Sequence, residues 1–137
     1  MRDLANHLTF KPAISPAAAI SDNTPLVSQI IDLAGFNSLC FAINIGVLVD
    51  ADATFAVLVE HGNQANLSDA AAVPDAQLTG TEASASFTFA ADNATRKIGY
   101  VGPKQYVRLT ITPAGNAGAA SISAMAVLGD PRYWPAA

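Results

Sequence analysis

The chain has few charged residues, and this composition limits the classes of function that fit the sequence. Only 13% of its 137 residues are charged, about half the share typical of a soluble domain. Such a surface is more typical of a subunit that packs against a neighbour than of a free enzyme. The net charge of −4 also argues against general nucleic-acid binding, which requires a basic surface. We therefore expect no nucleic-acid partner.

Cysteine and histidine are equally scarce. Cys40 is the single cysteine, so the fold cannot depend on an intramolecular disulfide, and its apolar setting favours a buried structural thiol over a nucleophile. His7 and His61 are far apart in the sequence, and neighbouring residues on a strand, such as Glu60 and His61, point to opposite faces. This spacing offers neither a zinc site nor an acid–base pair. We expect no catalytic residue, metal or cofactor.

The motifs of common catalytic and metal sites are missing as well. Asp50-x-Asp52-x-Thr54 opens like a calcium-binding loop, but Phe55 stands where glycine is required and His61 where glutamate is required. The chain has no Gly-x-Ser-x-Gly elbow and no phosphate-binding glycine loop. We interpret the acidic residues as a solvated turn and predict a protein without enzymatic activity.

Targeting signals are absent too. The N-terminus lacks the apolar region of a secretory signal, and no apolar run approaches the ~20 residues needed to span a bilayer. These features predict a soluble protein that is made in a cytoplasm and has no membrane partner. A length of 137 residues is enough for one domain with a single core.

Alternating apolar residues and turn residues run through most of the chain. The clearest alternation lies in residues 37–48, where every second side chain is large and apolar and is assigned to the core: Leu39, Phe41, Ile43 and Ile45. Further strands are predicted at 27–33, 54–61, 84–90, 95–101, 104–112 and 120–128, with a long surface loop at 62–80. Seven or eight short strands predict an all-β fold, a single antiparallel β-sandwich of jelly-roll or immunoglobulin-like topology.

The two ends differ from this sandwich, which we assign to residues 26–130. Pro12, Pro16 and Pro25 divide residues 1–25 and predict an extended N-terminal arm with at most a short strand around Leu8–Phe10. The apolar residues of this arm have no obvious core register, so we expect it to make mostly intermolecular contacts and to be dispensable for folding. Residues 131–137 form an aromatic tail, which either folds back on the core or anchors an interface.

Residues 96–108 form the one basic segment of an acidic chain. They contain four of the seven Lys and Arg residues and no Asp or Glu. The Gly102-Pro103 turn predicts that two strands form a hairpin here. Its cations either lie on a solvated strand or contact acidic groups of a neighbour. The candidate residues for an interface with a partner protein or with another copy are Leu8, Phe10, Lys11, Ile14, Arg96, Lys97, Lys104, Tyr133 and Trp134.

Five segments give the chain a family resemblance. They are the Met-Arg-Asp-Leu start, Ile31-Asp32-Leu33-Ala34-Gly35-Phe36, Val59-Glu60-His61, the basic segment 96–108, and Val127-Leu128-Gly129-Asp130-Pro131. With them the chain resembles small structural proteins of tailed bacteriophage virions. The resemblance implies a capsid decoration (cement) protein on the capsid surface, often a homotrimer. Its partners would be the major capsid protein and itself, and it would be made in the host bacterial cytoplasm.

Two other functions stay open at this stage. A head–tail connector or minor tail protein would also be a small β-rich virion component. A carbohydrate-binding β-sandwich module would need exposed aromatic side chains on a concave face. The chain has one Trp, three Tyr and six Phe, and many of these fall in core phase.

Overall fold

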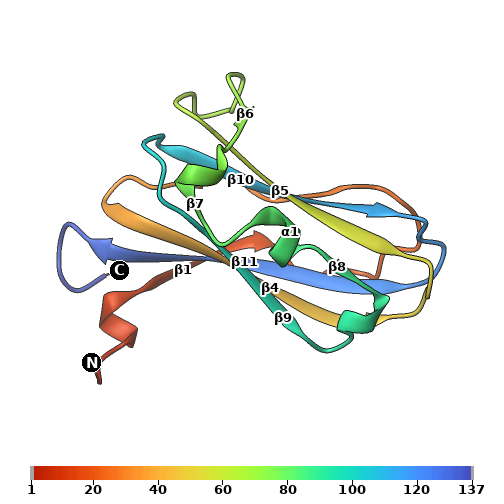
Figure 1. The fold of residues 1–137 in the computed structure, drawn as a ribbon. Helices are drawn as coiled ribbons and strands as arrows, with labels where there is room; N and C mark the ends of the chain where they lie inside the picture. Colours follow the sequence, from red (N-terminus) through yellow and green to blue (C-terminus); the bar gives the residue numbers. More distant parts are fainter. Residues whose placement is uncertain (1, 137) are drawn as a thin grey trace.

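The computed structural model describes residues 2–136, which form two antiparallel β-sheets packed face to face (Figure 1). The five-stranded sheet contains, in order, β1 (Thr9–Ile14), β11 (Ala120–Pro131), β4 (Phe36–Leu48), β9 (Thr95–Tyr100) and β7 (Leu78–Thr79). The six-stranded sheet contains β2 (Leu26–Val27), β10 (Tyr106–Ala114), β5 (Thr54–Gly62) and β6 (Ala71–Ala72), with β3 (Ile31–Asp32) paired to β10 and β8 (Phe87–Thr88) paired to β5. The predicted all-β sandwich is confirmed.

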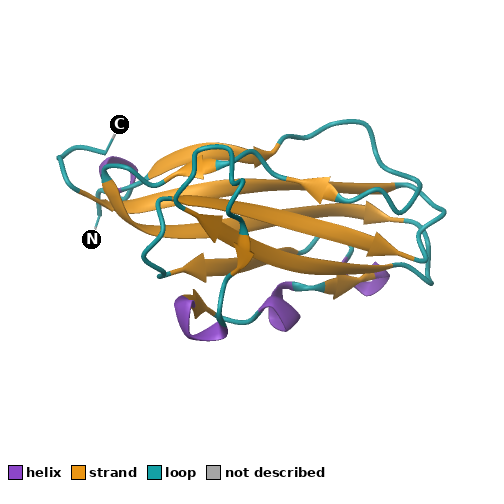
Figure 2. Cartoon of the chain, turned by 90° about the horizontal axis from the view of Figure 1, so that it is seen from above, coloured by secondary structure: helices purple, strands orange, loops and turns teal. Residues whose placement is uncertain are grey.

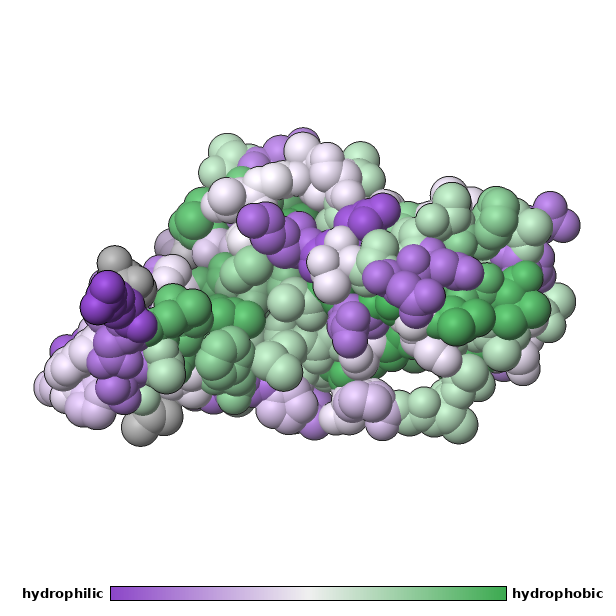
Figure 3. Space-filling view, turned by 90° about the horizontal axis from the view of Figure 1, so that it is seen from below, coloured by the Kyte–Doolittle hydropathy of each residue, from purple (hydrophilic) through white to green (hydrophobic). Residues whose placement is uncertain are grey.

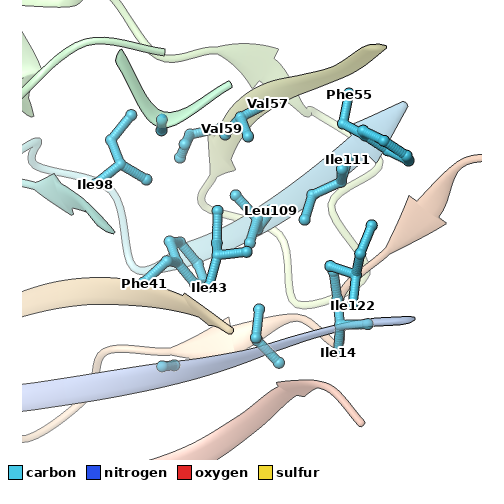
Figure 4. Packing of buried hydrophobic residues seen from close by; sticks show 14 of the residues in the cluster. Ile14, Phe41, Ile43, Phe55, Val57, Val59, Ile98, Leu109, Ile111 and Ile122 are labelled. Atoms are coloured by element: carbon cyan, nitrogen blue, oxygen red, sulfur yellow. The ribbon is translucent and has the colours of Figure 1, made fainter. Parts of the chain in front are cut away.

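The core lies between the two sheets, as the alternation in the sequence requires. The four apolar residues assigned to the core face of β4 are all buried: Leu39, Phe41, Ile43 and Ile45. Figure 4 shows side chains of β4 pointing toward those of β5 and β10 across the sandwich. On β5 the buried positions are Phe55, Val57 and Val59, as predicted. Alternation therefore identifies the inner face of each long strand.

Short helices close one side of the sandwich (Figure 2). They are η2 (Asp75–Gln77), α1 (Glu82–Ala85) and η3 (Phe89–Ala91), and a fourth, η1 (Ala5–His7), lies near the chain ends. α1 packs against β5 and β9, and a Glu82 carboxylate oxygen accepts the backbone N–H of Val59 at 2.7 Å. The Ser86 hydroxyl accepts the N–H of Val57 at 3.0 Å. These side chains satisfy donors on β5 that no strand pairs.

The basic segment is not a hairpin. β9 belongs to the five-stranded sheet, whereas β10 belongs to the six-stranded sheet, so residues 101–105 carry the chain from one sheet to the other. Buried and exposed residues alternate in both strands because both strands face the same core from opposite sides. The inner face of β10 carries Val107, Leu109 and Ile111, whereas Tyr106 lies on the outer face. Sequence alternation alone cannot distinguish this arrangement from a hairpin.

The predicted arm is joined to the sandwich over residues 9–14. These residues form β1, which pairs with β11 and is longer than the expected short strand. A bulge between Pro12 and Ile14 turns both Ala13 and Ile14 into the core. Pro12 has no N–H to donate, and its position on an edge strand accommodates that loss. Residues 15–25 are irregular apart from an isolated bridge between Ile20 and Ala120.

Other boundaries differ from the prediction in detail. The strand expected at 84–90 is replaced by α1, β8 and η3, because Thr81 caps a helical turn by accepting the N–H of Ser84. The strand expected at 27–33 divides into β2 and β3. The last strand continues to Pro131, so the tail begins one residue later. Among residues 2–136, no helix is long and apolar enough to cross a bilayer.

Candidate functional site

The outer face of the five-stranded sheet is broad and carries little charge. Two rows of residues, each paired with its neighbour on the next strand, cross this face from the edge strand β1 through β11 and β4 to β9. The first row is Phe10, Val127, Cys40 and Gly99, and the second is Pro12, Met125, Ala42 and Lys97. We call these eight residues the sheet face. Lys97 is its one charged member, and Figure 3 looks onto this side, where green and pale atoms cover much of the surface.

Two large apolar side chains stand out from the sheet face. Phe10 is 54% exposed and Met125 is 45% exposed, on the neighbouring strands β1 and β11. A hollow of about 370 Å³ lies beside Met125, between the end of β1 and the outer side of β4 and β11, and Ile14 and Ile43 form part of its floor. Covering a surface with few charges and exposed apolar side chains costs little free energy of desolvation.

The arm residues predicted for an interface separate into surface and core. Phe10 lies on the sheet face, and Leu8 is half-buried just before β1. Lys11 points to the inner side of the strand, and its Nζ lies 3.4 Å from the backbone oxygen of Asp32. Ile14 is buried in the core. The bulge in β1 turns it inward, so only the part of Ile14 that forms the floor of the hollow could contact a partner, and its place in an interface stays a prediction.

The cations of the basic segment do not share one face. Lys97 lies on the sheet face, whereas Arg96 is on the opposite side of β9 and donates to the backbone oxygen of its neighbour Thr95 at 3.0 Å. Lys104 lies in the connection between the sheets. Arg108 forms an ion pair with Glu60 of β5 at 2.9 Å, on the outer side of the six-stranded sheet. The structure therefore distributes these four residues over different surfaces.

The tail folds back toward the N-terminal segment. The Trp134 ring lies 4.1 Å from the His7 ring, centroid to centroid, in an edge-to-face arrangement, and the N–H of Ala136 donates to the Asn6 oxygen. Trp134 remains more than half exposed, and Tyr133 is 84% exposed. The two tail aromatics are therefore on the surface beside η1, and neither enters the core.

A polar cleft of about 580 Å³ opens at one end of the sandwich. The chain termini lie at the same end (Figure 1). Four separate segments line it: the β3–β4 turn, the start of the loop after β5, the β9–β10 connection, and the tail. Its cations are Lys104 and Arg132. Sequence analysis selected Lys104 but missed Arg132, because nothing in the linear order places residue 132 beside residue 104.

A hydrogen-bonded pair supports one side of this cleft. The Tyr100 hydroxyl lies 2.8 Å from Nδ1 of His61 and accepts the backbone N–H of Lys104 at 3.0 Å. Burial lowers the pKa of His61, and the Lys104 charge lowers it further. Burial also raises the pKa of Tyr100. Both side chains are thus held neutral, which suits a structural support of the cleft wall.

No cluster of metal-ligating side chains accompanies these surfaces. Within residues 2–136, no group of three or more His, Cys, Asp and Glu residues is placed to hold a metal ion. Cys40 is half-buried on the sheet face instead of fully buried, and burial raises its thiol pKa. A thiol with a raised pKa is a poor nucleophile.

The comparisons with known proteins identify the fold. No protein-family model and no curated protein matches the sequence. The structure is similar to part of the PBSX exported protein XepA, with a TM-score of 0.56 and 12% identity over 91% of this chain and 38% of that chain. It is also similar to part of a chain in the structure of infectious bursal disease virus Gx strain, with a TM-score of 0.51 and 12% identity over 93% of this chain and 33% of that chain.

These likenesses concern the β-sandwich alone. The chain spans between a third and two-fifths of the length of each of the two structures. At 12% identity, the shared feature is the packing of two antiparallel sheets. This chain has the fold of one β-sandwich domain found within those longer proteins.

Proposed function

We propose that this protein is a non-enzymatic structural component of a virion, specifically a decoration protein that binds the capsid surface. The observation that carries the proposal is the sheet face, with its exposed Phe10 and Met125 and its single charge at Lys97. A decoration protein requires a rigid body and a weakly hydrated surface for docking, and it requires no reaction centre. The occurrence of a similar sandwich in the structure of a virus supports this role.

The proposed partner is the major capsid protein, bound through the sheet face. Covering an apolar surface contributes roughly 25 cal/mol for each Å² removed from water. The affinity of one such contact is modest. Copies joined as a homotrimer would bind several capsid subunits at once, and this multivalency would raise the overall affinity. In this arrangement each copy connects neighbouring capsid proteins and opposes their separation.

The number of copies in a particle tests this role. Virions purified from the culture that carries the gene would be analysed by quantitative mass spectrometry, with the major capsid protein as the internal standard. A decoration protein is expected at hundreds of copies in each particle. About a dozen copies or fewer would instead support the alternative role of a head–tail connector or minor tail protein, and absence from the particle would overturn the proposal.

A matched pair of variants tests the surface. Phe10→Ser and Met125→Ser change exposed side chains of the sheet face, so the fold should be retained while binding to particles that lack the protein is lost. Val27→Ser and Leu58→Ser remove exposed apolar side chains from the six-stranded sheet and serve as the control. Equal binding by both pairs would show that the sheet face is not the docking surface.

A further inference from the structure

We propose that the polar cleft binds an acidic peptide segment of a neighbouring protein. This inference deepens the proposed function, on which it rests, by naming the chemistry of a second contact. The cleft is distinct from the sheet face. It lies at the end of the sandwich, and its walls come from the β3–β4 turn, Asn63, the 100–105 connection and Arg132.

The charges in the cleft are positive and unpaired. The Lys104 and Arg132 side chains have no ion-pair or hydrogen-bond partner within residues 2–136. The carboxylates of Asp69 and Asp32 lie nearby, and both already accept hydrogen bonds from other groups. Asp69 accepts the N–H groups of Asn63 and Gln64 at 2.8 and 3.2 Å. Asp32, likewise, accepts the N–H of Ala34 and the side-chain amide of Gln105 at 2.9 and 3.0 Å. The Lys104 charge contributes to the lowered pKa of Asp69, but neither carboxylate forms an ion pair with Lys104 or Arg132, so both cations can still bind an external carboxylate.

The remaining lining suits a peptide better than a free anion. Asn37 and Asn63 provide side-chain amides, which can both donate to and accept from a peptide main chain. Leu33, Phe36 and Pro103 provide an apolar surface for the methylene groups of an acidic side chain. The volume of about 580 Å³ lies within the range of sites that enclose a small ligand, about 300–1,000 Å³.

Hydrogen bonds hold the backbone on both sides of the cleft. The hydrogen bonds from Tyr100 to His61 and from the Lys104 backbone to Tyr100 fix the connection that carries the Lys104 side chain. On the other side, the N–H of Arg132 donates to the backbone oxygen of Gly35 at 2.8 Å. Because both cations are attached to anchored backbone, less ordering is required when a ligand binds.

The binding test uses blocked pentapeptides and NMR. The peptide Gly-Glu-Glu-Glu-Gly is titrated into the ¹⁵N-labelled full chain at constant ionic strength, with Gly-Gln-Gln-Gln-Gly and citrate as parallel probes. We expect saturable amide shifts confined to residues 33–37, 63 and 100–105 and to Arg132 for the glutamate peptide alone. No saturable shift, or equal binding of the glutamine peptide, would overturn the proposal. Binding of citrate without the glutamate peptide would also overturn it, in favour of a small-anion site.

A charge-matched pair of variants locates the site. Lys104→Gln with Arg132→Gln should weaken the glutamate peptide about fivefold or more, as expected for the loss of two partly exposed ion pairs. Arg96→Gln with Lys97→Gln changes the net charge equally and should leave the affinity unchanged. Equal weakening by both pairs would show general attraction and overturn the cleft assignment. Particle copy number is measured separately, so failure of peptide binding leaves the virion role standing, and absence from virions leaves the cleft result standing.

Discussion

The Tyr100 hydroxyl lies 2.8 Å from Nδ1 of His61, and this bond connects the two sheets at the wall of the cleft. Because the backbone N–H of Lys104 already donates to the hydroxyl oxygen, the hydroxyl proton is available to donate to Nδ1. This direction requires a neutral imidazole. The lowered pKa of His61, caused first by burial and then by the Lys104 charge, agrees with it.

Stability should therefore depend on pH through His61. Its pKa is lower in the folded state than its ordinary value of 6.5, so the unfolded chain binds the proton more readily. The contribution is fully present above pH 6.5 and is lost as the pH falls through the folded-state pKa. We expect urea denaturation to show a lower free energy of unfolding at pH 5.5 than at pH 7.5. His61→Gln should reduce this difference. An equal difference in the two proteins would contradict the prediction.

Gly102→Ala should destabilise the fold. A Cβ at this position would lie 2.6 Å from both Cζ and the hydroxyl oxygen of Tyr100, so the ring would have to move and its bond to His61 would be strained. Such overpacking typically costs about 1–3 kcal/mol, which thermal or chemical denaturation can measure. In a Tyr100→Leu background the cost should shrink, because the clashing end of the ring is gone. The same cost in both backgrounds would exclude the ring as its cause.

Glu82→Ala should be costly although Glu82 belongs to neither candidate surface. The substitution leaves the buried N–H of Val59 without an acceptor, which costs about 1–3 kcal/mol. Glu82→Gln retains an oxygen at the same place and should recover most of this loss. Denaturation curves of the two variants test the role of the carboxylate oxygen. Equal destabilisation would show that the negative charge matters and the acceptor does not.

Ile14→Ala and Phe10→Ser should have very different effects on stability. Ile14 is 8% exposed and packs in the core, so its truncation should cost about 2–5 kcal/mol. Phe10 is more than half exposed, and its replacement should cost well under ~1 kcal/mol.

Because Ile14 packs in the core, deletion of residues 2–20 should lower the free energy of unfolding of the sandwich. This prediction replaces the expectation that the arm is dispensable. A folded deletion protein of unchanged stability would contradict this.

Sequence alone predicted the fold class because apolar and polar residues alternate regularly in the central parts of β4 and β5. Positions Leu39 through Ile45 and Phe55 through Val59 each bury every second side chain, and this pattern depends only on local strand geometry. The pairing of β9 with β4 and of β10 with β5 could not be predicted in this way. Strands of one hairpin and strands of facing sheets show the same alternation, so long-range pairing decides between them.

The candidate surfaces were predicted less completely. Phe10, Lys97 and Lys104 were selected from composition and charge, and they lie on exposed or partly exposed surfaces. Arg132 was missed because the cleft is formed by segments about 30 to 100 residues apart in sequence. The burial of Ile14 was not predicted because a bulge, which has no signature in the sequence here, turns it inward.

The side chains of Glu82 and Ser86 also restrict how copies of this protein can assemble. They occupy backbone donors of β5 that an incoming strand would need, while β6 and β8 pair with the two ends of β5. The six-stranded sheet cannot grow sideways past β5 from one molecule into the next. Strand addition, which has no natural limit, is therefore blocked at this edge, and copies that meet there must do so through contacts between faces or ends, which close at a defined number of copies.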